Sequence, residues 1–192
     1  MSPNQQAKRD EIVDAAVEVL LHEGVHGCTV RSIAATAGVS KGAVHYYFSD
    51  VEDIIDQAML KAARIWIQWL GAGGSSGLKE PASPIQLFWH AMSICLAPFA
   101  HGDRSLMPLW LEYWAMRSRA NRIEPLQVLQ ELMISYVTEL MEAAGVADAP
   151  ERAIGVTAYL FGVSMQESIL SVPKQTVMGQ IAALCGLDPP KP

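Results

Sequence analysis

Two short helical patterns separated by a single glycine occupy residues 29–48, and their closeness constrains the fold more than any other feature of the sequence. The first pattern places apolar side chains at i, i+3, i+4 and i+7, on one face of a helix: Val30, Ile33, Ala34 and Ala37. Gly38 then supplies a residue that adopts a positive φ without strain. The second pattern would bury Val44, Tyr47 and Phe48. This arrangement predicts a helix-turn-helix.

A capping residue precedes each of these patterns, and a longer helical pattern lies upstream. Thr29 and Ser40 carry side-chain oxygens that accept hydrogen bonds from the free N–H groups at a helix start. Residues 10–23 repeat apolar side chains with a helical period, and Gly24 marks the expected end of this helix. Its apolar positions are Ile12, Ala15, Ala16, Val19 and Leu20. We therefore expect three helices that close one small core.

Helical periodicity continues to the end of the sequence. A fourth helix is predicted over 51–70, and the glycine-rich stretch at 71–77 predicts a linker. Further helices are predicted at 84–100, 104–119, 123–145, 150–171 and 174–186. No segment alternates convincingly with the period of two that a strand requires. We expect an all-α fold of about nine helices, with a small N-terminal domain at 1–50 and a larger helical domain at 51–192.

The composition favours a globular protein and gives no sign of catalytic or metal-binding machinery. Hydrophobic residues make up 51% of the 192 residues, which is ample for a core. The three cysteines, Cys28, Cys95 and Cys185, are odd in number and far apart, which argues against a disulfide framework or a zinc site and favours a reducing cytoplasm. We find no catalytic grouping, phosphate-binding loop or metal-ligand spacing, so we expect no enzyme, no metal and no cofactor. The uncharged stretch between Arg152 and Glu167 is too short to supply the roughly 20 apolar residues of a membrane span, so we expect a soluble protein.

The charge distribution within 29–48 favours contact with nucleic acid, although the whole chain is acidic. The formal net charge is −6, yet this segment contains Arg31 and Lys41 and none of the 20 acidic residues. The face of the second pattern opposite its apolar side is expected to be exposed, and a DNA major groove admits one such helix. That face carries Lys41, Gly42, Ala43, His45 and Tyr46. The pattern alone also allows a helical protein-interaction module without DNA binding.

The motif AATAGVSKGAVHYYF at 34–48 follows the first helix and its glycine, and it precedes an acidic start to the fourth helix. This combination, over residues 10–59, resembles the DNA-binding domain of the TetR/AcrR family of transcriptional regulators. The resemblance implies a repressor that leaves a palindromic operator when its C-terminal domain binds a small-molecule effector. It also implies a homodimer formed through the last two helices. The DNA contacts that it implies by position are Thr29, Arg31, Ser32, Ser40, Lys41, Gly42, Ala43, His45 and Tyr46.

One position departs from this resemblance. Family members often carry a lysine near the start of the fourth helix that binds phosphate, whereas the aligned residue here is Val51, beside Asp50. We therefore expect phosphate binding to depend more on Arg31, on Lys41 and on the pair Lys8–Arg9.

Large apolar side chains are grouped in the central predicted helices. Each taken singly is expected to be core, but the resemblance implies that some of the set line an effector pocket. The candidates are Trp89, Met92, Trp110, Tyr113, Trp114, Phe161 and Met165. Glu112 lies among three of them and would suit a cationic ligand, although the sequence also allows a surface position or a pair with Arg117 or Arg119. The surrounding stretch 109–125 is similar to betaine-inhibitor-type repressors, from which we transfer no ligand.

The last two predicted helices carry the features expected of a subunit interface. Small residues recur at Gly155, Ala158 and Gly162, which permits close approach of a neighbouring helix. Val177, Ile181 and Leu184 give the final helix an apolar face. We expect part of this surface to be buried against a second copy of the chain and part to pack within one copy.

Overall fold

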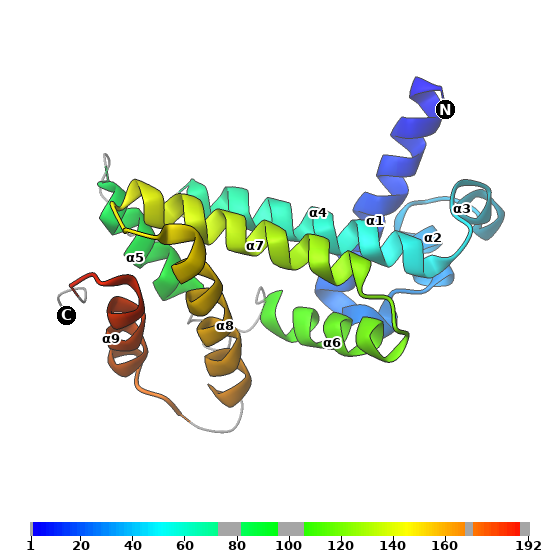
Figure 1. Ribbon diagram of the computed structural model, residues 1–192. Helices are drawn as coiled ribbons and strands as arrows, with labels where there is room; N and C mark the ends of the chain where they lie inside the picture. The colour runs from blue at the N-terminus through cyan, green and yellow to red at the C-terminus, as the bar shows by residue number, and fades with distance from the viewer. Residues whose placement is uncertain (1, 73–81, 96–105, 168–170, 189–192) are drawn as a thin grey trace. The chain divides into compact units, whose positions relative to one another are not determined.

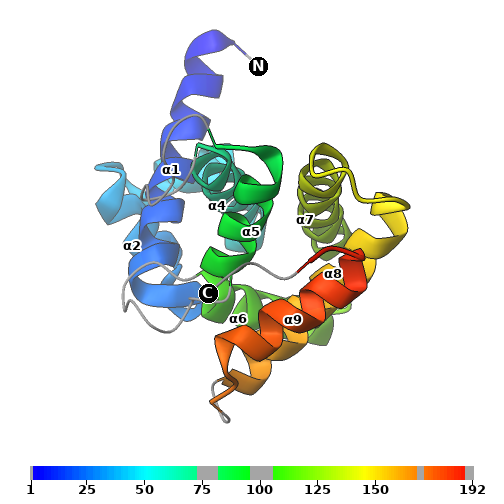
Figure 2. The same cartoon turned by 90° about the vertical axis from the view of Figure 1, so that its left-hand side faces the viewer.

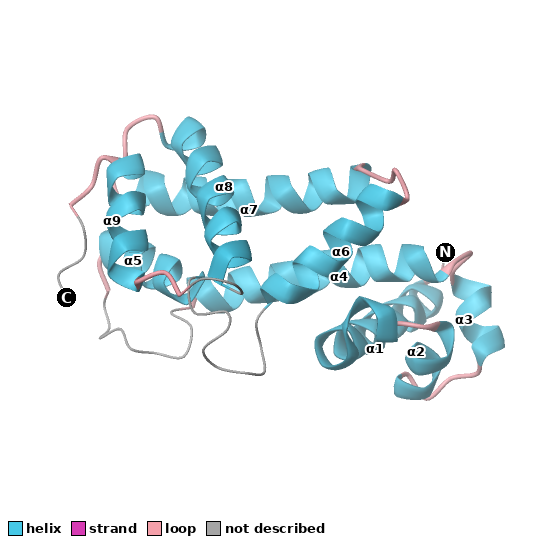
Figure 3. Cartoon of the chain, turned by 90° about the horizontal axis from the view of Figure 1, so that it is seen from below, coloured by secondary structure: helices cyan, strands magenta, loops and turns pink. Residues whose placement is uncertain are grey.

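The computed structural model describes residues 2–72, 82–95, 106–167 and 171–188, and in these ranges all the regular structure is α-helical (Figure 3). The helices described are α1 (Pro3–Gly27), α2 (Val30–Thr36), α3 (Lys41–Tyr47), α4 (Val51–Gly71), α5 (Pro84–Cys95), α6 (Leu106–Arg119), α7 (Glu124–Ala143), α8 (Ala149–Glu167) and α9 (Lys174–Cys185). The predicted all-α fold is confirmed, because these ranges contain nine helices and no strand.

The first helix is longer than the sequence predicted, at both ends. It begins at Pro3, where Ser2 forms a capping box with Gln5, and proline at the first helical position suits this start. Gly24 has φ 73° and ψ −176°, so it interrupts the helix where the sequence predicted an end. One more helical turn follows and ends at Gly27.

Several predicted features fall outside the described ranges. Most of the predicted linker at 71–77 does so, as do the ends of the helices predicted over 84–100 and 150–171. The chain divides into two compact units, Met1–Trp66 with Leu106–Leu126, and Ile67–Ser105 with Gln127–Pro192. Each unit is described separately below, and the functional boundary between residues 50 and 51 stays a prediction.

The first unit joins α1, α2, α3, most of α4 and α6. Helix α1 packs against α2 and α6, and α2 packs against α3; in Figure 1, α1 to α3 are blue and α6 is green. The core of this unit contains apolar side chains from the first four helices, among them Ile12, Leu20, Ile33, Val44 and Ile54, each no more than 1% exposed. The predicted small core is therefore present, and α6 joins it from a part of the sequence far from the N-terminus.

The second unit is formed by α5, most of α7, α8 and α9. Its core joins apolar side chains from all four helices, among them Phe88, Met92, Met141, Val156 and Ile181. Helices α8 and α9 lie side by side (Figure 2). None of the described helices is long and apolar enough to cross a membrane.

Candidate nucleic-acid interface

Helix α2 begins with a dense set of local hydrogen bonds. The Thr29 hydroxyl accepts the Ser32 N–H at 3.1 Å, and the Thr29 N–H donates to the Ser32 hydroxyl at 2.9 Å. The Ser32 hydroxyl also lies 2.6 Å from the Gly27 carbonyl, so it links the end of α1 to α2. Thr29 and Ser32, two of the three predicted DNA contacts at the start of α2, therefore also have a structural role, since they satisfy free donors at the helix start.

Helix α3 presents most of the exposed face that its sequence predicted, but Tyr47, predicted to be buried, and Ala43, predicted to be exposed, are both half-buried. Val44 and Phe48 are 1% and 2% exposed, whereas Tyr46 is 70% exposed. Ser40 caps the helix by accepting the Ala43 N–H at 3.1 Å. Lys41, Gly42 and His45 are exposed with Tyr46, while Ala43 and Tyr47 are half-buried. The exposed face thus combines a cation, an imidazole and a phenol with a glycine that adds no bulk.

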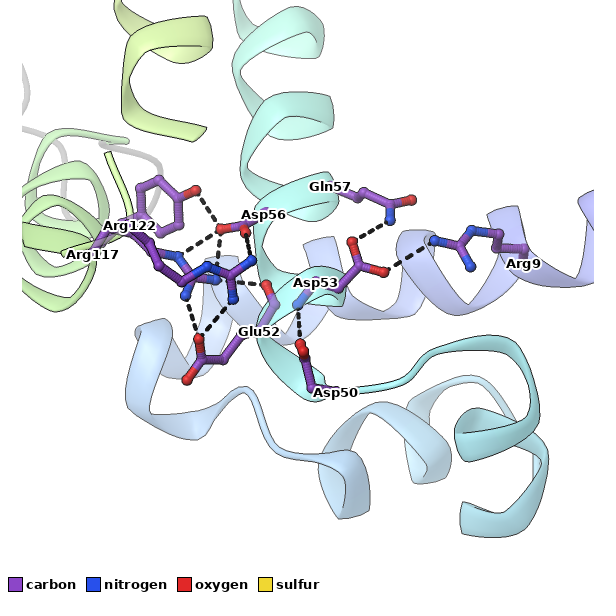
Figure 4. A network of polar contacts seen from close by, with 9 residues as sticks. Arg9, Asp50, Glu52, Asp53, Asp56, Gln57, Arg117 and Arg122 are labelled. Atoms are coloured by element: carbon purple, nitrogen blue, oxygen red, sulfur yellow. Dashed lines mark hydrogen bonds and ion pairs between the residues drawn. The ribbon is translucent and has the colours of Figure 1, made fainter. Parts of the chain in front are cut away.

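The carboxylates that follow α3 are engaged by other groups of the protein. Asp50 caps α4 by accepting the Asp53 N–H at 2.6 Å. Asp53 is paired with Arg9, whose Nη2 lies 3.2 Å away. Figure 4 shows that Glu52 and Asp56 face the other side of α4, toward Arg117 and Arg122. These pairings offset part of the negative charge at the start of α4, the helix that follows α3.

Arg117 joins α6 to the start of α4. It is fully buried, and its Nη1 lies 2.7 Å from a Glu52 carboxylate oxygen. Its Nε donates to Asp56 at 2.7 Å, and the Tyr113 hydroxyl donates to the same Asp56 oxygen at 2.6 Å. Hydrogen bonds from Arg117 and then Arg122 hold the pKa of Glu52 below its usual value. This network keeps Glu52 ionised and fixes α6 against the helix that follows α3.

A second contact joins α6 to the end of α1. The Glu112 carboxylate accepts the Val25 N–H at 3.1 Å, next to the break at Gly24. The break leaves this N–H without its helical acceptor, and Glu112 supplies one instead. A Cβ on Gly24 would lie 2.9 Å from the same carboxylate oxygen. The sequence had allowed Glu112 to pair with Arg117 or Arg119, and the structure gives it this backbone partner.

Two residues of α1 contact α3, and sequence reasoning identified neither contact. Arg9 donates to the Tyr47 carbonyl at 2.5 Å, and its guanidinium lies 3.9 Å from the centre of the Phe48 ring. One turn earlier, Gln5 donates to the Tyr46 hydroxyl at 3.2 Å. Phosphate binding by Lys8 and Arg9 stays a prediction, and Lys8 is paired with Glu11 at 2.6 Å. The sequence feature that could have indicated these contacts is the four-residue spacing of Gln5 and Arg9, which places both on one face of α1.

The predicted effector-binding residues are divided between the two units. Helix α6 in the first unit carries Trp110 and Tyr113, which are buried, and Trp114, which is 54% exposed. The second unit carries the others: Met92 is buried, Trp89 and Phe161 are half-buried, and Met165 is 54% exposed. Trp89 lies edge-on to Phe88, with ring centres 4.9 Å apart. Effector binding by these seven residues stays a prediction.

Two buried hydroxyl groups of the second unit have no hydrogen-bond partner among the described residues. They belong to Tyr136 on α7 and Thr157 on α8. Burial is the main reason that the pKa of Tyr136 is raised. A buried hydroxyl without a partner destabilises the fold, because it loses its hydrogen bonds to water.

The predicted subunit interface contains exposed apolar side chains. Ile154 and Met165 on α8 are 57% and 54% exposed, and Leu184 on α9 is 38% exposed. A Cβ on Gly155 or Gly162 would meet no atom within 4 Å, so α8 is open beside both glycines. By contrast, Val177 and Ile181 of the predicted apolar face are buried within the second unit.

The sequence of this chain is similar to those of known bacterial transcriptional regulators. Residues 12–58 match the sequence pattern of the tetR family of bacterial regulatory proteins. The chain is similar to the HTH-type transcriptional regulator BetI of Burkholderia cenocepacia (strain HI2424), 23% identical over 176 residues that cover 90% of this chain and 88% of BetI. A protein of the same name from Serratia proteamaculans (strain 568) is 25% identical over 174 residues, which cover 86% of this chain and 83% of that one.

Solved structures share the fold over nearly the whole chain. The member of TetR family SCO1917 from Streptomyces coelicolor A3 superposes with a TM-score of 0.62 and 23% identity, over 93% of this chain and 98% of that one. The multidrug binding protein EbrR complexed with ethidium gives a TM-score of 0.67 and 23% identity, with the same coverage. At these identities the likeness establishes a helix-turn-helix domain followed by a helical C-terminal domain.

Proposed function

Because this chain belongs to the TetR family of bacterial regulatory proteins, we propose that it represses transcription as a homodimer on a palindromic operator and leaves the DNA when a small molecule binds. Family membership makes it a DNA-binding transcriptional regulator of the helix-turn-helix type. Repression, the palindromic operator and release by an effector are our proposal. We propose that residues 1–50 bind DNA and that residues 51–192 bind the effector and form the dimer.

The exposed face of α3 is the observation that carries the DNA-binding proposal. Lys41 is exposed at its first turn, where a cation reaches phosphate or guanine, and His45 and Tyr46 are exposed one turn later. Gly42 lies between them, exposed and without a side chain that would hold the helix away from the groove. Arg31 adds a second exposed cation from α2. The capping residues Thr29, Ser32 and Ser40 are proposed to contact phosphate beside these groups.

The proposed effector is a small apolar molecule. The candidate binding residues are large apolar side chains, Trp110, Tyr113 and Trp114 in the first unit and Trp89, Met92, Phe161 and Met165 in the second. The similar EbrR is described as a multidrug binding protein and has been solved with ethidium, which supports effector binding by this fold. A cationic effector held by Glu112 forms no part of the proposal, since that carboxylate already accepts the Val25 N–H.

The proposed dimer uses α8 and α9. Exposed Ile154 and Leu184 supply apolar surface, and Gly155 and Gly162 permit close approach of a partner helix. Replacing Ile154 by Glu should shift the protein from dimer to monomer in analytical ultracentrifugation, because a charge would be buried at the interface. Replacing exposed Val128 on α7 by Glu is the matched control and should leave the dimer intact.

Selection of bound duplexes from a random DNA pool, repeated across salt concentrations, tests the proposed function. We expect a palindrome to be enriched, with affinity falling as salt rises, because Lys41 and Arg31 displace counterions from phosphate. Addition of the effector, once identified by screening, should release the enriched duplex. No enrichment at low salt from well-folded dimer would refute operator binding and favour the protein-interaction module that the sequence also allowed.

A further inference from the structure

The position of α3 depends on few contacts within the first unit. The helix has seven residues, of which only Val44 is buried, and Phe48 is buried at its end. A helix this short is not stable alone, so groups outside it must hold its direction. The N-terminal turns of α1 supply two such groups. Gln5 and Arg9 lie one turn apart on α1 and contact Tyr46 and Tyr47 respectively.

We infer that Arg9 is a positioning residue that orients α3 for DNA, rather than a cation that binds phosphate. Its guanidinium makes three contacts at the same time. One nitrogen donates to the Tyr47 carbonyl, another is paired with Asp53, and the flat face lies over the Phe48 ring. The side chain is 22% exposed. Arg9 therefore ties α1 to the end of α3 and the start of α4, and this role rests on the proposed DNA contact by α3.

The chemistry of this contact requires arginine. A planar guanidinium can donate two hydrogen bonds in different directions while its face stacks on an aromatic ring. A lysine ammonium is a compact point charge and cannot make these three contacts together. The free carbonyl at the end of α3 favours a positive charge, which strengthens the bond to Tyr47. Figure 4 shows the Arg9 side chain directed at Asp53, while Arg117 and Arg122 approach α4 from the opposite side.

Gln5 makes the second contact and fixes the role of the Tyr46 hydroxyl. The Gln5 carbonyl oxygen accepts the Ser2 N–H at 2.9 Å, so its amide nitrogen is the atom that faces Tyr46. That nitrogen donates to the Tyr46 oxygen at 3.2 Å. The hydroxyl proton of Tyr46 is then directed elsewhere. Tyr46 is therefore prepared to donate to an acceptor on DNA, either a phosphate oxygen or a base edge.

The test compares Arg9→Gln, Arg9→Lys and Asp53→Asn with the control Arg64→Gln, which removes an exposed cation of α4. Affinity is measured for the selected operator and for unrelated duplex at several salt concentrations. Positioning predicts that Arg9→Gln weakens operator binding about tenfold or more. In Arg9→Gln the slope of log affinity against log salt should equal that of the wild type. Arg9→Lys should bind the operator as weakly as Arg9→Gln does. Asp53→Asn weakens operator binding too, because Arg9 loses its ion-pair partner, and Arg64→Gln has little effect.

A phosphate contact predicts the opposite pattern and would overturn the inference. In Arg9→Gln the slope of log affinity against log salt would fall by about 0.9 for each protomer. Arg9→Lys would bind the operator like the wild type, and Asp53→Asn would bind it more tightly because Arg9 would be free to contact phosphate. Unchanged operator affinity in Arg9→Gln would overturn it equally. Gln5→Ala, at an exposed contact that does not endanger folding, should lower operator affinity to a smaller degree.

Hydrogen exchange separates this inference from the proposed function, because it requires no DNA. Arg9→Gln should accelerate exchange of the α3 amides about tenfold or more and leave those of α7 to α9 unchanged. Unchanged exchange in α3 would contradict positioning even if the wild-type protein binds its operator. Failure of the wild-type protein to bind any duplex, with accelerated α3 exchange in the variant, would reject the proposed function and leave the positioning of α3 established.

Discussion

Arg117 on α6 and Glu52 in the first turn of α4 lie 2.7 Å apart, although 65 residues separate them in the sequence. The same guanidinium donates to the Glu52 carbonyl at 2.6 Å and to Asp56. Helix α6 is thereby held against the segment that follows α3, while Glu112 holds it against the segment that precedes α2. Both flanks of the helix-turn-helix thus depend on one helix from the later part of the chain.

Replacing Arg117 by Met should lower the free energy of unfolding by about 3 kcal/mol, at the lower end of the cost of breaking a buried pair, because Asp56 loses its buried partner while Glu52 remains partly exposed. Arg122 contacts the same two carboxylates but is 41% exposed, so Arg122→Gln should cost less than about 1 kcal/mol. Urea unfolding of both variants measures the difference. Equal losses would show that burial of Arg117 does not determine its contribution.

The lowered pKa of Glu52 predicts a pH-dependent contribution to stability. The folded-state pKa lies below the usual 4.5, so the ion pairs contribute fully above that value and are lost as pH falls through the folded pKa. Glu52→Gln should therefore be less stable than wild type at pH 7, and the difference should shrink below about pH 4.5. Unfolding curves between pH 7 and pH 3 test this. A difference that stays constant across this range would contradict the prediction.

Replacing Gly24 by Ala should destabilise the first unit. Its φ of 73° with ψ −176° is a conformation in which an alanine costs about 1–3 kcal/mol. The added Cβ would also press on Glu112 and endanger its bond to Val25. Gly38→Ala is the control, since Gly38 has φ 65° but no atom within 4 Å of a Cβ. Thermal unfolding should show a larger loss for Gly24→Ala, and the reverse order would count against the contact with Glu112.

The helix-turn-helix was predictable because its signals are local. Apolar spacing and the caps Thr29 and Ser40 determine α2 and α3, and burial of Val44 with exposure of Tyr46 confirms the predicted faces. The same reasoning placed Gly24 at a break in the first helix. Periods and caps lie within a few residues of each other, so they can be read without knowledge of tertiary contacts.

The contacts that hold the helix-turn-helix were not predictable, because they join residues distant in sequence. Arg9 meets Asp53 across 44 residues, and Glu112 meets Val25 across 87. The spacing of charged residues along a helix does not indicate which distant group each will contact. Glu112, for example, lies near Arg117 and Arg119 in the sequence but accepts the Val25 N–H instead. The sequence likewise shows the charge of Arg9 but not that its side chain is only 22% exposed.

Two buried tyrosines should respond oppositely to loss of their hydroxyl groups. Tyr136 has no hydrogen-bond partner among the described residues, so Tyr136→Phe should be neutral or stabilise the fold by up to about 1 kcal/mol. Tyr113 donates to Asp56 at 2.6 Å, so Tyr113→Phe should cost about 1.5–3 kcal/mol. Chemical denaturation of the two variants makes the comparison. Destabilisation by Tyr136→Phe would mean that its hydroxyl has a partner.

The salt dependence of operator binding by Lys41→Ala tests most directly the claim that α3 contacts DNA. Loss of one phosphate contact per protomer should lower the slope of log affinity against log salt by about 1.8 for a dimer. Arg64→Ala removes an exposed cation near the other end of α4 and is the matched control, with no expected change in slope. A reduced slope and weaker binding for Lys41→Ala alone is the predicted result. Equal affinities and slopes for both variants and wild type would contradict DNA contact through this face of α3.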